Sequence, residues 1–149
     1  MNDRKKKLVD EIAFYRDLIA SRHATVDTIL TDVQRVEILL AKAEVAFEDE
    51  DDSVVETLSD EIVRVTVNRI ALLLTDAQKT FVRGQPNLRF KTSVDVVKEI
   101  HSTIKDFNMN ETTKEWFKRN CELLEGLAKA AESAGKGLPG NIRKKQTAA

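Results

Sequence analysis

The chain has 149 residues, a formal net charge of −1 and one cysteine. This length suits a single domain, and a lone Cys121 excludes an internal disulfide. The five glycines and two prolines all lie at or after Gly84. Because strand-rich domains need these residues in their turns, the first 83 residues are predicted to be helical. Their lack of glycine also excludes a glycine-rich phosphate loop there.

The charge is divided unevenly along the chain. Residues 1–63 carry 8 basic and 16 acidic side chains, a net charge of −8, whereas residues 64–149 carry 16 basic and 9 acidic side chains, a net charge of +7. Nine acidic residues and no basic residue fall between Glu44 and Glu61. This division predicts that the halves pair within one chain, or head to tail between copies. Simple solvation of both halves is the alternative.

The first helix is predicted over residues 3–21, where apolar residues recur at helical spacing from Leu8 to Ile19. Asn2 or Asp3 can cap its start. Three lysines at positions 5–7 fall in its first turn, where the helix dipole disfavours cations. These lysines therefore either contact a partner or belong to a frayed end.

The second helix carries the clearest pattern in the sequence. Thr25 is a suitable N-cap, and the following residues hold three heptads in which every a and d position is apolar. Leu30 and Leu39 widen this stripe, which favours a bundle or an antiparallel hairpin over a two-stranded coiled coil. The stripe consists of Val26, Ile29, Val33, Val36, Leu40, Ala43 and Phe47.

An acidic stretch at 48–52 predicts a connecting loop, because it has no apolar residue and repels itself. Ser53 and Glu56 then match a capping box. The third helix is predicted over 54–83 with two apolar stripes, although the β-branched segment 62–67 could pass for a strand. One stripe is Val63, Val67, Ile70, Leu74, Ala77 and Phe81, and the other is Val55, Leu58, Ile62, Val65 and either Leu72 or Leu73.

Gly84 and Pro86 end the third helix. A short extended link at 88–91 leads to a fourth helix over 93–107, with Val97, Ile100, Ile104 and Phe107 on one face. A fifth helix is predicted over 111–134, capped by Asn110 and ended by Gly135. The last residues are basic and nearly free of apolar side chains, which is typical of a flexible tail.

Together these patterns predict an all-α fold of about five helices: a long antiparallel, coiled-coil-like hairpin plus two C-terminal helices. Residues 1–134 form one helical domain, in which 1–83 hold the N-terminal helix and the hairpin and 92–134 hold the C-terminal pair. Residues 135–149 form a basic flexible tail.

Metal and cofactor chemistry find little support. The three soft or nitrogen ligands, Cys121, His23 and His101, are fewer than the four that a structural zinc site needs. The acidic loop lacks the central glycine and alternating ligands of an EF-hand. The carboxylates of Glu56, Asp60 and Glu61 could hold Mg²⁺ only with a matching set on a second helix, which is missing. We therefore expect neither a metal nor a cofactor.

Enzymatic chemistry is also not expected. Cys121 and His101 could form a nucleophile pair, but Cys121 lies on the apolar stripe of its helix, where a buried inert thiol is the ordinary finding. The segment 130–137 resembles a Walker A loop, yet Gly137 stands where Ser or Thr is needed, and the segment follows a helix.

Membrane insertion is excluded because no apolar run approaches the ~18 residues of a spanning helix. The basic N-terminus has no following apolar region, so it is not a signal peptide. With a single cysteine, the protein is expected in the reducing cytoplasm.

We therefore predict a non-enzymatic helical assembly or adaptor protein, a homo-oligomer with further protein partners, that associates through coiled-coil-like packing. The residues expected to form the core or the oligomer contact are Val26, Ile29, Val33, Val36, Leu40, Phe47, Val63, Val67, Ile70 and Leu74.

The alternative is an oligomeric nucleic-acid-binding accessory factor, such as a viral or bacterial DNA packaging, replication or recombination component. It would use the basic link 83–91 and the basic termini to neutralise phosphates. The expected contacts are Lys5, Lys6, Lys7, Arg83, Arg89, Lys91, Arg143, Lys144 and Lys145.

Overall fold

The computed structural model describes the backbone of residues 3–48, 53–82 and 90–148, and the side chains of residues 3–48, 53–76 and 94–132. These backbone ranges contain five α-helices and no strand, which confirms the all-α fold. The helices are α1 (Asp3–Ile19), α2 (Val26–Ala46), α3 (Ser53–Val82), α4 (Phe90–Ile104) and α5 (Glu111–Ala148).

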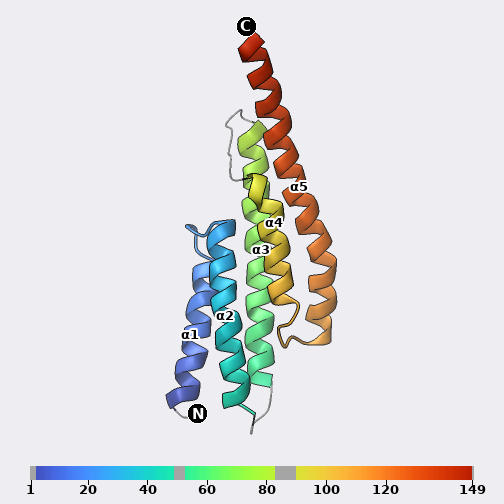
Figure 1. Ribbon diagram of the computed structural model, residues 1–149. Coiled ribbons are helices and arrows are strands. Elements are labelled where there is room, and N and C mark those ends of the chain that lie inside the picture. Colours follow the sequence, from blue (N-terminus) through green and yellow to red (C-terminus); the bar gives the residue numbers. More distant parts are fainter. Residues whose placement is uncertain (1–2, 49–52, 83–89, 149) are drawn as a thin grey trace.

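Successive helices run up and down the long axis of the bundle (Figure 1). The helices α2 and α3 are antiparallel neighbours, as the predicted hairpin requires, but each packs more extensively on another helix: α2 on α1, and α3 on α5. Because α4 packs on both α2 and α5, the last four helices form a four-helix bundle. The first helix, α1, lies against α2 and α3.

The start of α2 is stabilised by a capping box between two threonines. The hydroxyl of Thr25 accepts a hydrogen bond from the backbone N–H of Thr28 at 3.2 Å. In return, the backbone N–H of Thr25 donates to the hydroxyl of Thr28 at 2.7 Å. Both groups would otherwise lack partners at a helix start, so the predicted N-cap at Thr25 is confirmed.

The heptad stripes of α2 and α3 form the core of the single chain. The buried members are at most 3% exposed, and Val26 is partly buried against them. The structure decides between the two leucines that could continue the second stripe: Leu73 packs against the core, whereas Leu72 is 57% exposed. The side chains of Ala77 and Phe81 lie outside the described residues. The buried members are Ile29, Val33, Val36, Leu40, Ala43, Phe47, Val63, Val67, Ile70 and Leu74.

Three helix boundaries differ from the sequence prediction by three residues or more. The fourth helix already includes Phe90 and Lys91, which the sequence assigned to an extended link, and it ends at Ile104. It ends there because the N–H of Phe107 bonds to the carbonyl of Ile104, three residues back, which closes a tighter final turn. The fifth helix continues past Gly135 to Ala148. A glycine costs a helix only about 1 kcal/mol relative to alanine, so it is a weak stop signal. The flexibility of residues 135–149 stays a prediction.

Asn110 fastens the start of α5 to α3. Its side-chain oxygen accepts from the N–H of Thr113 at 2.8 Å, which confirms the predicted cap. Its backbone N–H donates to Asp60 of α3 at 3.2 Å, and its side-chain amide donates to the same carboxylate. One turn further along α3, the guanidinium of Arg64 lies over the ring of Trp116, 4.9 Å from its centre. These contacts set the register of α5.

No helix in the described part of the chain combines the length and the apolar character needed to cross a membrane.

Candidate ligand-binding pocket

Among the residues whose side chains are described, the structure does not bring the predicted nucleic-acid contacts together into one surface. Lys5 lies over the ring of Phe47, 5.3 Å from its centre, so it contributes to packing at the end of α2. Lys6 and Lys7 are exposed on α1. The side chains of the other predicted contacts, Arg83, Arg89, Lys91, Arg143, Lys144 and Lys145, lie outside the described residues.

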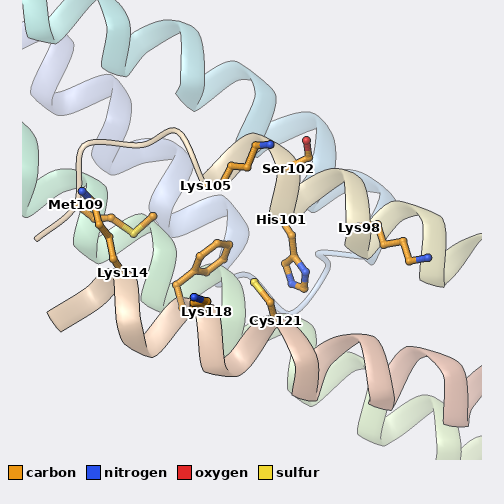
Figure 2. A pocket seen from close by; sticks show the side chains of 9 residues that line it. Lys98, His101, Ser102, Lys105, Met109, Lys114, Lys118 and Cys121 are labelled. Carbon is orange, nitrogen blue, oxygen red and sulfur yellow. The ribbon is translucent and has the colours of Figure 1, made fainter. Parts of the chain in front are cut away.

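The most developed pocket in the described part of the chain lies between α4 and α5 and has a volume of about 470 Å³. This volume is within the usual range of about 300–1,000 Å³ for small-molecule sites. Both helices and the segment between them line it (Figure 2). The lining residues are Lys98, His101 and Ser102 of α4, Lys105 and Met109 of the connecting segment, and Lys114, Phe117, Lys118 and Cys121 of α5.

The inner surface of this pocket is apolar. Met109 is 3% exposed and Phe117 is 5% exposed, and the half-buried Cys121 adds a thiol. The rings of Phe117 and His101 meet edge to face, with centres 5.6 Å apart, a favourable aromatic geometry. Together these side chains offer an apolar surface to a bound molecule.

Four exposed lysines complete the lining, and no carboxylate is part of it. Lys114 approaches Glu111 at 3.4 Å. Within the part of the chain that the structure describes, Lys98, Lys105 and Lys118 make no ion pair. The pocket is therefore positively charged, and three of its ammonium groups are available to an anion.

His101 is the buried polar group of the pocket. It is 8% exposed, and neither ring nitrogen has a hydrogen-bond partner. Its Nδ1 lies 3.9 Å from a carboxylate oxygen of Glu125, which is too far for a hydrogen bond. Burial lowers the pKa of His101, and the charge of Glu125 opposes this only in part. The ring is therefore neutral at pH 7 and offers one N–H donor and one acceptor.

Cys121 is only half-buried and lines the pocket, whereas the sequence predicted a buried thiol. Burial, followed by the charges of Glu125 and Glu122, raises its pKa to about 11. The thiol is thus protonated at neutral pH, although the thiolate is the form that attacks substrates and binds metals. Figure 2 shows His101 reaching from α4 toward the helix that carries Cys121, yet the pair lacks an activated nucleophile.

Two of the three carboxylates considered for Mg²⁺ contact other elements of the fold. Asp60 accepts two hydrogen bonds from Asn110, and Glu61 pairs with Arg16 of α1 at 2.6 Å. Among the described residues, no group of three or more histidine, cysteine or carboxylate side chains is placed to hold a metal ion. The acidic residues 49–52 lie outside them.

Comparison with known proteins identifies no relative, since no family model, curated protein or solved structure matches this chain.

The sequence interpretation missed the pocket, although a signal was present. Along α4 and the turn that follows it, the lining residues have the spacing 98, 101, 102, 105, and on α5 they have the spacing 114, 117, 118, 121. Each set lies on one helical face and combines lysines with an aromatic ring or a small side chain. Sequence alone could have identified each face, but not that the two faces meet.

The stability of the fold should depend on pH through His101. Because its folded pKa is below its ordinary value, the unfolded chain takes up a proton first as the pH falls. We expect the free energy of unfolding to be constant above about pH 6.5 and to fall on acidification below it. Urea titrations between pH 7.5 and 5.5 would measure this slope.

The matched variants are His101→Gln and His23→Gln. The first removes the buried titrating ring and should flatten the slope. The second changes a histidine that is exposed in the segment between α1 and α2, and it should leave the slope unchanged. Equal slopes for wild type and His101→Gln would contradict the assignment.

Proposed function

We propose that the protein is a non-enzymatic α-helical adaptor that associates with copies of itself through the outer faces of α1 and α2. The observation that supports this proposal is that several large apolar side chains remain exposed on the single chain. Of the six large apolar side chains that are exposed among the described residues, four lie on these two adjacent helices: Phe14 (57%), Leu18 (37%), Ile38 (48%) and Val45 (62%).

The core stripes are not available for this association. Residues such as Val33 and Val67 are buried inside one chain, so contact through them would require the bundle to open. Burial of a large apolar side chain contributes about 1.5–3 kcal/mol, whereas association costs at least about 4 kcal/mol in lost freedom. Four exposed side chains therefore support an association that depends on concentration.

The charges around Phe14 also favour contact between copies. This ring borders a shallow depression whose other lining residues are acidic and basic side chains of α1: Asp3, Lys6, Lys7, Asp10 and Glu11. In a two-fold contact the same surface occurs on both chains. The lysines at 6–7 of one copy can then face the carboxylates at 10–11 of the other, around a pair of Phe14 rings.

Light scattering coupled to size-exclusion chromatography tests this proposal over a range of protein concentrations. The wild type should exceed its monomer mass of 16.8 kDa as concentration rises, and the double variant Phe14→Ser, Ile38→Ser should stay at that mass. Leu72→Ser, Leu123→Ser is the matched control, because these two residues are equally exposed on α3 and α5. A monomeric wild type at every concentration would refute the proposal, as would equal loss of association in both double variants.

Nucleic-acid binding is the second candidate, and the continuity of α5 favours it. This helix runs without interruption from Glu111 to Ala148, so the basic positions 143–145 lie on the same helix as Lys114 and Lys118. Affinity for a DNA duplex should fall steeply with salt, and truncation after residue 135 should weaken it without unfolding the bundle. Absence of binding at low salt would remove this candidate.

A further inference from the structure

We propose that the pocket between α4 and α5 binds a small organic anion, with its apolar body on Met109 and Phe117 and its carboxylate or phosphate head at the lysines. The proposed site is separate from the self-association surface, because it lies on helices other than α1 and α2. Two observations carry it: the apolar inner surface of the pocket, and three lining lysines that make no ion pair with a described residue.

The apolar surface of the pocket indicates that the body of the ligand is apolar. Met109 and Phe117 are almost fully buried yet line the pocket, so they contact whatever fills it. Inorganic phosphate alone would leave this surface against water, whereas an alkyl or aryl group would cover it and gain the free energy of apolar burial. A volume of about 470 Å³ accommodates such a group.

The lysines indicate that the head group of the ligand is negatively charged. Lys98 lies on α4, Lys105 follows directly after the end of that helix, and Lys118 lines the same pocket from α5. None of the three makes an ion pair with a described residue. A carboxylate or phosphate placed between the two helices would gain charge-assisted hydrogen bonds from both.

His101 belongs to the inner wall of the pocket and does not contact the head group. Both of its ring nitrogens are buried and have no hydrogen-bond partner, so a molecule in the pocket can touch only carbon atoms of the ring. The same burial argues against nucleic acid as the occupant, because neither His101 nor Phe117 exposes a ring face on which a base could stack.

Isothermal titration calorimetry on the full chain at low ionic strength tests the site with four probes. Octanoate and octyl phosphate carry both parts of the expected ligand, octanol lacks the charge, and inorganic phosphate lacks the apolar body. At least one of the two octyl anions should bind, and both partial probes should bind at least tenfold more weakly. Comparing the two octyl anions identifies the preferred head.

Variants then assign the binding to this pocket. Lys105→Gln and Lys118→Gln, both at exposed positions, should each weaken the octyl anion about tenfold, which corresponds to about 1.4 kcal/mol. Lys129→Gln is the matched control, because this lysine is also exposed on α5 but does not line the pocket. His101→Gln, used only after its melting curve shows a folded chain, should keep measurable but weaker binding.

Several outcomes would overturn the proposal. They are the absence of binding by either octyl anion, equal affinity for octanol, and equal loss in Lys129→Gln and Lys118→Gln. A DNA duplex whose affinity depends on Lys105 and Lys118, with no binding of the octyl anions, would instead assign this surface to nucleic acid. None of these outcomes depends on the oligomeric mass of the protein, so the test is independent of the proposed self-association.

Discussion

Replacing Leu40 with aspartate should unfold the bundle at 25 °C. Leu40 is 3% exposed and lies in the middle of the buried stripe of α2, among apolar neighbours. A carboxylate buried there without a partner costs several kcal/mol, and the lost apolar contacts of the leucine add about 2–5 kcal/mol. Domains of this kind have about 5–15 kcal/mol of stability in total. Circular dichroism should therefore show loss of most helical signal, and urea should produce no cooperative transition.

The control is the neighbouring variant Ala41→Asp. Ala41 is exposed on the same helix, so its replacement adds the same charge without burial. We expect a change of less than about 1 kcal/mol, from the lower helix propensity of aspartate. A melting curve for Leu40→Asp that matches the wild type would show that the face of α2 has been assigned incorrectly.

Phe47→Ala should lower the free energy of unfolding by about 3–5 kcal/mol. Phe47 is fully buried at the C-terminal end of α2, where its N–H bonds to the carbonyl of Ala43 at 2.9 Å. Its removal leaves a cavity and also frees Lys5, whose ammonium lies over the ring. Urea unfolding followed by tryptophan fluorescence measures this loss, since Trp116 lies on a different helix.

Two further variants separate these contributions. Lys5→Gln removes the cation over the ring while keeping Phe47 in place, and the loss of this contact should cost about 0.5–1 kcal/mol. Leu123→Ala removes a large apolar side chain that is 63% exposed, and it should change stability by less than about 0.5 kcal/mol. If Leu123→Ala cost as much as Phe47→Ala, burial would not be what distinguishes the two positions.

The two proposed binding surfaces use different parts of the bundle. Self-association involves Phe14 on α1 and Ile38 on α2, whereas the anion site involves Lys105, directly after α4, and Lys118 on α5. In the structure α1 contacts neither α4 nor α5 extensively. One surface can therefore be removed by mutation while the other is measured.

The sequence by itself determined the helices and much of the core, because the signals for both are local. A run without glycine or proline up to residue 83 excludes strand-rich folds. The heptads from Val26 to Phe47 identify the buried face of α2, and Thr25 and Asn110 cap their helices as predicted. Each of these features depends only on residues within a few turns, so spacing and residue type are sufficient to predict it.

Only the tertiary structure decided which helices are neighbours and what lies between them. The most extensive contact, between α3 and α5, joins segments far apart in the chain, and the hydrogen bonds of Asp60 with Asn110 lie at its start. Leu72 has the same local pattern as its buried neighbours but is left exposed. The pocket follows for the same reason: periodicity places Lys98 and Lys118 on helical faces, but only the packing of α4 on α5 brings those faces together around His101.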